Sequence, residues 1–119
     1  MKLPKAARLR RRREFLAVQE RGARLYAGDV LVLFKGAGAD RARIGITVSS
    51  KVANAVERNR VKRWVREAFR EIQAELPPVD LVVIARAGAL GMGLAGARRA
   101  LASSRDALAK GAAAKGRVP

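Results

Sequence analysis

The chain has 119 residues, which is enough for one domain with a modest core and too few for two. Its 26 Lys and Arg against 10 Asp and Glu give a net charge of +16, which favours phosphate-rich partners. Without cysteine it has no disulfides or thiolate ligands, and without histidine it lacks the commonest general base. No apolar run could span a bilayer and no signal peptide is recognisable, so the sequence predicts a cytoplasmic protein that does not bind membranes.

The N-terminal segment, residues 1–13, is dense in positive charge. Such a segment can be a solvated arm or can lie along a nucleic acid, and a second basic tract on the same small domain favours the latter. A short helix is expected from about Arg12 to Arg21, with Phe15 and Gln19 on one side and Gly22 at its end. The basic arm ends in Arg10, Arg11, Arg12 and Arg13.

Two regions rich in strand formers follow. Residues 25–35 contain the apolar run 30–34, and residues 26–29 divide the region into two strands. Residues 36–40 have the composition of a turn. Residues 43–50 alternate between apolar side chains and small or polar ones, which predicts a strand with one face suited to a groove.

The strongest pattern is a helix from about Arg58 to Leu76, ended by two prolines and preceded by Asn54 as a cap or turn residue. One face is apolar and the opposite face is basic. Like charges four residues apart on the basic face cost about 1 kcal/mol in total, which a face that only met solvent would avoid by mixing signs. Glu67 and Glu71 lie to one flank, where they can partner Arg60 and Arg63. The apolar face holds Val61, Trp64, Val65, Ala68, Phe69 and Ile72, and the basic face holds Asn59, Lys62, Arg63, Arg66 and Arg70.

The C-terminal part adds a strand and a helix. Residues 80–86 form a buried strand by composition, residues 88–96 a loop, and residues 94–110 a last helix. This order of elements indicates an α+β sandwich with helices against one sheet. We therefore expect a single RNA-binding domain over residues 1–110 and a disordered tail over residues 111–119.

The basic helix has the chemistry of a surface that binds a polyanion, because guanidinium groups bind two phosphate oxygens at once and stay charged. Its run from Asn54 to Arg66 resembles the signature of the bacterial ribonuclease P protein component. The likeness extends from Phe15 and Gly22 to the strand ending in Arg86. The core of the motif is Arg58-Asn59-Arg60-x-Lys62-Arg63-x-x-Arg66.

This resemblance implies a fold and a function. The fold is an α-β-β-β-α-β-α sandwich with a four-stranded sheet and a left-handed βαβ crossover, against the general preference for right-handed crossovers. The function is that of the protein subunit of ribonuclease P, whose partners are the ribonuclease P RNA and precursor tRNA rather than a small-molecule substrate. The RNA subunit cuts the 5′ leader with Mg²⁺ bound mainly by RNA, and the sequence shows no nucleophile with a base and no short-spaced metal ligands.

The resemblance also implies which residues bind RNA. Phe15 and Phe34 would stack on leader bases, each worth about 1–3 kcal/mol, although core packing is the alternative for both. Gln19 stands where the family often has a second aromatic residue, and it can form hydrogen bonds but stacks poorly. The residues expected to bind the catalytic RNA are Asn54, Arg58, Asn59, Arg60, Lys62, Arg63, Arg66 and Arg70, and those expected to bind the leader are Phe15, Gln19, Phe34, Lys51 and Arg86.

Two other functions remain open at this stage. A small ribosomal-type structural RNA-binding protein would share the charge, the size and the lack of cysteine, but it would need no fixed order of basic residues. DNA binding through the central helix is less favoured, because the apolar face of this helix is wide and no helix-turn-helix turn precedes it.

Overall fold

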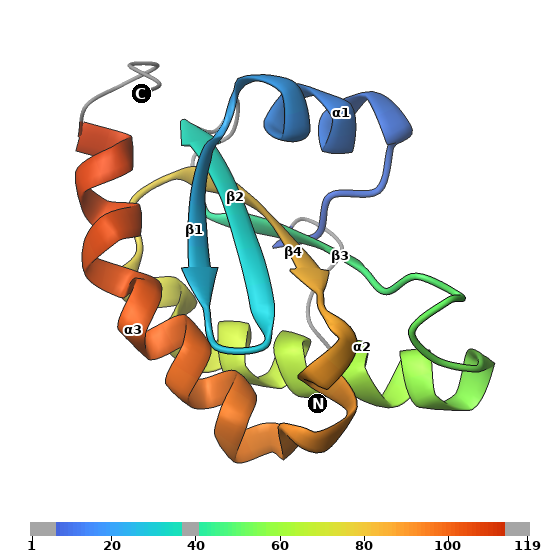
Figure 1. Cartoon of the computed structure of the whole chain (residues 1–119). Coiled ribbons are helices and arrows are strands. Elements are labelled where there is room, and N and C mark those ends of the chain that lie inside the picture. Colours follow the sequence, from blue (N-terminus) through green and yellow to red (C-terminus); the bar gives the residue numbers. More distant parts are fainter. Residues whose placement is uncertain (1–6, 37–40, 114–119) are drawn as a thin grey trace.

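The computed structural model describes residues 7–36 and 41–113, and it shows a sheet covered by helices on both faces (Figure 1). The predicted α+β order is confirmed. In chain order the elements are α1 Arg12–Arg21, β1 Ala23–Ala27, β2 Val30–Gly36, β3 Arg43–Thr47, α2 Ala55–Ile72, the short 3-10 helix η2 Gln73–Glu75, β4 Val79–Ala85, the short 3-10 helix η3 Ala87–Gly91 and α3 Gly93–Ala113.

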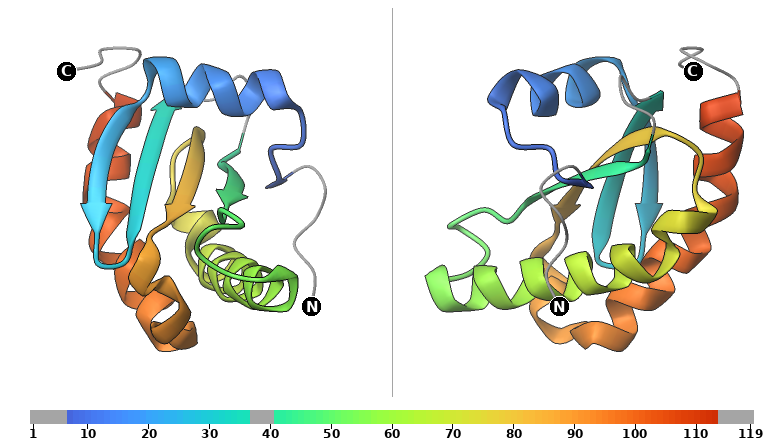
Figure 2. Two further views of the ribbon diagram at one scale, coloured as in Figure 1. Left: turned by 45° about the vertical axis from the view of Figure 1, so that its right-hand side comes forward. Right: turned by 180° about the vertical axis from the view of Figure 1, so that it is seen from behind.

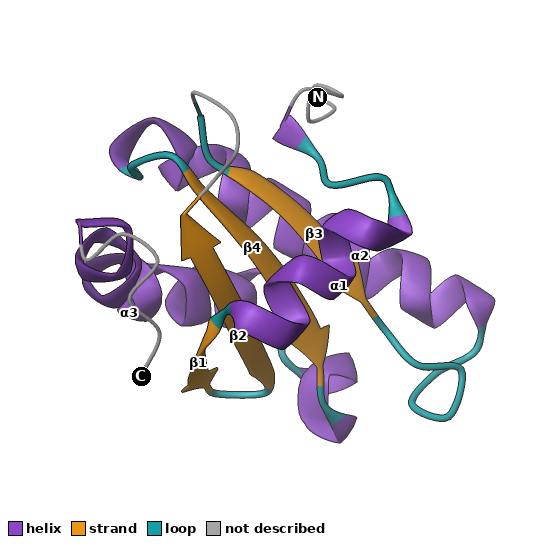
Figure 3. Ribbon diagram, turned by 90° about the horizontal axis from the view of Figure 1, so that it is seen from above, coloured by secondary structure: helices purple, strands orange, loops and turns teal. Residues whose placement is uncertain are grey.

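The four strands lie in the order β1-β2-β4-β3. β1 and β2 form an antiparallel hairpin, β2 pairs antiparallel with β4, and β3 pairs parallel with β4. The turn of the hairpin places Gly28 at φ +58°, a backbone conformation that favours glycine. Between the parallel neighbours the chain passes through α2 behind the sheet, and the crossover is left-handed (Figure 3).

The two faces of the sheet carry separate apolar clusters. On one face α2 and α3 pack against each other and against the sheet, over buried residues such as Val32, Ile44 and Leu81 (Figure 2). On the other face α1 lies alone and buries Leu33 and Val82. We call this second side the α1 face. Because side chains alternate along a strand, the two central strands β2 and β4 contribute to both clusters, which explains why their sequences are largely apolar on both sides.

The structure corrects several predicted boundaries. α2 begins at Ala55 rather than near Arg58, and β3 ends at Thr47 rather than Ser50. Residues 87–91 form η3 and α3 begins at Gly93, so most of the expected loop at 88–96 is helical. α3 continues to Ala113, so residues 111–113 of the expected disordered tail are helical, while residues 114–119 lie outside the described part. Near the N-terminus, Arg8 pairs with Ile44 at the outer edge of β3, so part of the expected arm is attached to the sheet, and residues 1–6 lie outside the described part.

Candidate nucleic-acid interface

α2 begins at a reciprocal cap that fixes the start of the basic helix. The Asn54 Oδ1 atom accepts a hydrogen bond from the Glu57 backbone N–H at 2.9 Å, and the Glu57 Oε1 atom accepts one from the Asn54 backbone N–H at 3.0 Å. This capping box satisfies two amides that the helix leaves without intrahelical partners. The predicted capping role of Asn54 is thereby confirmed, and its side-chain oxygen is engaged within the helix start.

The two predicted faces of α2 are confirmed. Asn59, Arg60 and Arg63 are exposed, and Lys62 and Arg66 are half-buried. Long basic side chains commonly lay an apolar stem against the protein and keep the charged group in water. The apolar side packs onto the sheet and α3, with Val61, Val65, Ala68 and Phe69 buried and Trp64 and Ile72 half-buried.

Two other predicted RNA-binding arginines are engaged within the protein. The Arg58 Nη1 atom donates to the Ala53 carbonyl at 2.8 Å, which ties the side chain to the loop before α2. The Arg70 Nη2 atom lies 2.6 Å from the Glu67 Oε1 atom. These contacts leave Arg58 and Arg70 less free to meet a ligand than the exposed residues of the same helix.

The acidic residues of α2 do not have the predicted partners. Glu67 pairs with Arg70 on its own helix, and Glu71 pairs with Arg98 of α3 at 2.7 Å, so the expected pairing with Arg60 and Arg63 is wrong. The cause is that Glu71 faces α3, an arrangement that the helix alone does not reveal. Within the described residues, Arg60 and Arg63 form no ion pair.

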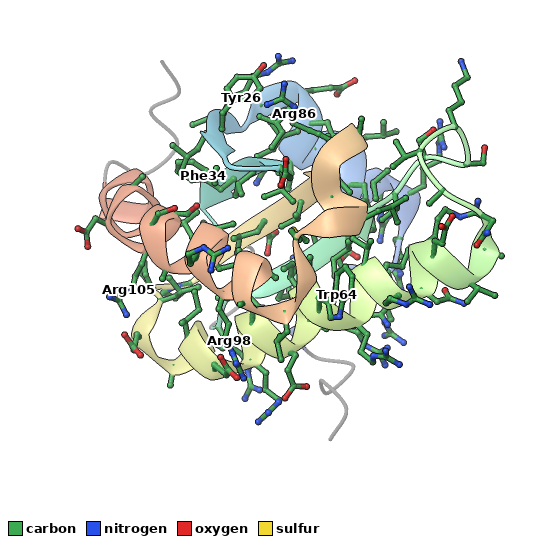
Figure 4. The ribbon with its side chains drawn as sticks, turned by 60° about the horizontal axis from the view of Figure 1, so that its bottom comes forward. Tyr26, Phe34, Trp64, Arg86, Arg98 and Arg105 are labelled. Carbon is green, nitrogen blue, oxygen red and sulfur yellow. The ribbon has the colours of Figure 1, made fainter. Side chains whose placement is uncertain are left out.

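Two ion pairs join α2 and its following turn to α3. Arg98 of α3 pairs with Glu71, and Arg105 of α3 pairs with Glu75 at 2.6 Å. Figure 4 labels the two arginines on α3. The hydrogen bond from Arg98 holds the pKa of the Glu71 carboxyl below its usual range, so Glu71 stays ionised and paired. Because α3 takes these carboxylates, the exposed arginines of α2 keep an uncompensated positive charge.

The α1 face is only partly covered by its helix. Phe15 packs directly over Gly45 of β3, where an added Cβ atom would lie 2.5 Å from the phenyl ring. Beyond α1, the side chains of Leu31, Thr47 and Ile84 are half-buried. The strand register places them in one row across the sheet, next to the row that α1 covers. We call these three residues the open row.

The predicted leader-binding residues fall in different places. Phe15 and Gln19 are half-buried on α1, Arg86 is exposed where β4 ends, and Lys51 is exposed in the loop before α2. Phe34 is a correction, because it is 6% exposed in the cluster beneath α2 and α3, on the face opposite to Phe15. A buried ring there cannot stack on a base, so the alternative of core packing is the correct one for Phe34.

The four arginines of the basic arm project around the start of α1. Their side chains are exposed, while the backbone amides of Arg10 and Arg11 each donate to the Glu14 Oε1 atom at 3.0 Å. The amide of Arg11 is the main cause that lowers the pKa of the Glu14 carboxyl, and Arg43 adds to it. The other Glu14 oxygen accepts from Arg43 at 3.1 Å, which ties α1 to the sheet. The arm is thus placed beside the α1 face.

Two features of this region were not predicted from the sequence. The Arg86 guanidinium carbon lies 5.2 Å from the centre of the Tyr26 ring, and Tyr26 is exposed on β1. Arg43 bridges Glu14 and Asp80 in the structure. Alternation along β1 could have placed Tyr26 on the face opposite to the half-buried Leu25 and the buried Ala27, but contacts between distant strands leave no local pattern in the sequence.

Comparison with known proteins identifies what the chain resembles. The family model described as Ribonuclease P matches residues 3–108. The ribonuclease P protein component of Desulfatibacillum aliphaticivorans is 48% identical over 83 residues, which are 69% of this chain and 70% of that protein. The structure of the ribonuclease P protein from Staphylococcus aureus has a TM-score of 0.78 at 30% identity and covers 90% of this chain and 98% of its own. The one from Thermotoga maritima has a TM-score of 0.73 at 36% identity, covering 87% and 96%.

Proposed function

This chain belongs to the bacterial ribonuclease P protein family, and from this membership we propose that it binds the catalytic RNA and the 5′ leader of precursor tRNA. In that complex it supports the endonucleolytic maturation of tRNA 5′ ends. The observation that carries the proposal is the exposed basic face of α2, where Asn59, Arg60 and Arg63 face solvent and nearby carboxylates are paired elsewhere.

The α2 face suits the backbone of a folded RNA. Arginine side chains donate paired hydrogen bonds to phosphate oxygens, and an uncompensated row of them lowers the repulsion between two polyanions that must approach each other. Lys62 and Arg66 extend the same surface. The role we assign to this surface is assembly with the catalytic RNA, with Asn54, Arg58 and Arg70 contributing mainly by fixing the helix and its flanks.

The bond-breaking chemistry belongs to the RNA subunit in this proposal. The chain has no histidine or cysteine. In residues 7–36 and 41–113 no group of three or more acidic side chains could hold a metal ion. The side chains of these residues therefore do not fit a catalytic metal bound by the protein, and we assign the Mg²⁺ ions to the RNA. Side chains of this protein would position the two RNAs.

The α1 face suits the single-stranded leader. Phe15 offers a half-exposed ring and the open row offers apolar surface. Lys51 in the loop between β3 and α2, and Arg86 at the end of β4, supply positive charge. Stacking platforms flanked by basic residues bind single strands with little sequence preference, which is what a subunit acting on many precursors needs. The exposed arginines of the basic arm would draw the leader toward this face.

The proposed substrate also indicates the cellular compartment of the protein. Precursor tRNA is made and trimmed in the bacterial cytoplasm, and we assign the protein to that compartment. No helix in the described part of the chain is both long and apolar enough to cross a bilayer.

The test is cleavage of precursor tRNA by a bacterial ribonuclease P RNA at low Mg²⁺, with and without this protein. We expect cleavage at the mature 5′ end to depend on the protein and to be lost in the double variant Arg60→Ala, Arg63→Ala. Arg105→Ala is the matched control, because it removes an exposed arginine that pairs with Glu75 on the side of α3. A protein that binds RNA but leaves cleavage unchanged would instead support the ribosomal-type alternative.

A further inference from the structure

Tyr26 is the most exposed aromatic side chain of the protein. The five aromatic residues all lie in the described part of the chain, and Phe34 and Phe69 are buried while Phe15 and Trp64 are half-buried. Tyr26 is 61% exposed. A chain with so few aromatic residues gains most by burying them, so an aromatic ring left in solvent needs another reason.

The strand register places Tyr26 on the same side of the sheet as Phe15. Tyr26 pairs with Leu31, Leu31 pairs with Ile84, and Ile84 pairs with Thr47, so the tyrosine continues the open row to the β1 edge. Phe15 lies at the other edge, over Gly45 of β3. Three steps between neighbouring strands separate the two edges, which is about 14 Å. The α1 face therefore has an aromatic ring at each edge and apolar side chains between them.

Arg86 is held beside the tyrosine by a separate element. Its guanidinium carbon lies 5.2 Å from the centre of the Tyr26 ring, and Figure 4 shows the two side chains next to each other. The Arg86 backbone N–H donates to the Asp29 carbonyl at 2.9 Å, which fixes the end of β4 against the hairpin turn. An aromatic ring that can stack on a base and a guanidinium group that can donate hydrogen bonds to a phosphate thus lie side by side at the end of the open row.

We propose that Tyr26 and Arg86 form a second nucleotide-binding position at the β1 edge of the α1 face. The Tyr26 ring stacks on one leader base, and the Arg86 guanidinium binds the adjoining phosphate. This inference rests on the proposed function and deepens it. Gln19 offers little stacking surface on α1, and Tyr26 supplies an aromatic ring elsewhere along the same face. The leader would then cross the sheet from Phe15 to Tyr26 over the open row.

A surface contact that only holds the hairpin to β4 would give a different result on mutation. In that case replacing Tyr26 would lower the melting temperature and leave RNA binding unchanged. A nucleotide-binding position has the opposite signature, because the ring is exposed and its loss removes a contact made only in the complex. The two readings are therefore separated by measuring stability and leader affinity on the same variants.

The experiment uses the complete holoenzyme and compares precursor tRNA with mature tRNA. Tyr26→Ala should weaken precursor binding by about 5- to 100-fold, with Tyr26→Phe restoring it, since phenylalanine keeps the ring. Mature tRNA, which has no leader, should bind equally to all three proteins. Abasic substitutions along the leader should reveal one position that weakens wild-type binding and has no further effect in Tyr26→Ala.

The possible failures are distinguishable. If the wild-type protein supports leader-dependent binding and cleavage but Tyr26→Ala binds precursor equally well, the second position is wrong and the proposed function stands. The second position is also wrong if Tyr26→Ala changes only the melting temperature. It is wrong as well if every abasic substitution that weakens binding to the wild-type protein weakens binding to Tyr26→Ala by the same factor. If the wild-type protein gives no protein-dependent cleavage, the proposed function fails and this inference fails with it.

Discussion

Arg43 and Asp80 face each other at the start of the parallel strands β3 and β4, joined by two hydrogen bonds. The Arg43 Nε and Nη2 atoms donate to the two carboxylate oxygens at 2.9 and 2.8 Å. The remaining Nη1 atom donates to Glu14 of α1 at 3.1 Å. One planar guanidinium therefore links two strands and the helix above them, which fixes where α1 lies on its face.

We expect Arg43→Ala to lower the free energy of unfolding by about 3 kcal/mol, because it leaves a buried carboxylate without its partner. The Asp80 side chain is 7% exposed. Urea unfolding measures the loss. The control is Arg98→Ala, which breaks a two-oxygen pair of similar geometry with Glu71 at the surface, and its effect should be much smaller. Equal losses for the two variants would show that burial of the pair is unimportant.

A second prediction concerns pH. The pKa of Glu14 is lowered from its ordinary value of 4.5, chiefly by the Arg11 amide and with a contribution from Arg43. A carboxyl with a lower pKa in the folded state stabilises the protein above its unfolded-state pKa, and this stabilisation is lost as pH falls through the folded-state pKa. Wild type should therefore exceed Glu14→Gln in stability at neutral pH, and the gap should close below pH 4.5. Denaturant titrations of both proteins across this range measure it, and a gap that widens in acid would contradict the assignment.

A third prediction separates the two phenylalanines that the sequence treats alike. Phe34→Ala should lower the free energy of unfolding by about 3–5 kcal/mol, because it opens a cavity beneath α2 and α3. Phe15→Ala should cost less stability and should weaken leader binding in the holoenzyme. Thermal melts and precursor affinities, measured on both variants, test the contrast. A Phe34→Ala protein with unchanged stability would be incompatible with the burial of this ring.

The same residues show how far sequence reasoning reaches. The faces of α2 were predictable because eighteen helical residues repeat one apolar pattern against a basic one. β2 is apolar on both sides, so its composition does not tell which helix covers Phe34 or Leu33. That assignment depends on the pairing of β2 with β4, and such a register is set by the whole sheet. The hand of the crossover was expected from family resemblance, since the general rule predicts the opposite hand.

The missed features share one physical cause. Arg43 and Asp80 are 37 residues apart, and they meet only because β3 and β4 pair in one particular parallel register. Tyr26 and Arg86 meet only because β1 and β4 flank β2. No local periodicity encodes either contact. Asn54, by contrast, was expected as a cap or turn residue, and the structure shows it as the cap; such a contact can be recognised locally, because a capping box depends on residues three apart in the chain.

A fourth prediction compares two close approaches to glycine. A Cβ atom at Gly45 would meet the Phe15 ring at 2.5 Å, and one at Gly22 would meet the backbone oxygens of Val18 and Phe34 at 2.4 and 2.8 Å. A side chain can turn away, whereas backbone atoms held by helix and sheet hydrogen bonds cannot. Gly22→Ala should therefore lower the free energy of unfolding more than Gly45→Ala does. For Gly45→Ala we expect a loss of about 1–3 kcal/mol, together with weaker leader binding because Phe15 is displaced. Urea unfolding and precursor affinity measure the two effects, and the reverse order of stabilities would contradict the packing at Gly22.

The last prediction concerns the salt dependence of binding to the catalytic RNA. Each phosphate contact releases counterions, so the slope of log affinity against log salt reports how many contacts form. Arg60→Ala and Arg63→Ala should each reduce that slope by about 1, and their helical circular dichroism should match wild type because both side chains are exposed. Arg105→Ala should leave the slope nearly unchanged, since this residue is paired with Glu75 on α3. Filter-binding titrations at several salt concentrations provide the measurement. Equal slopes for all four proteins would mean that the RNA lies on a different surface, and a loss of helix signal in Arg60→Ala or Arg63→Ala would show that the faces of α2 are wrongly assigned.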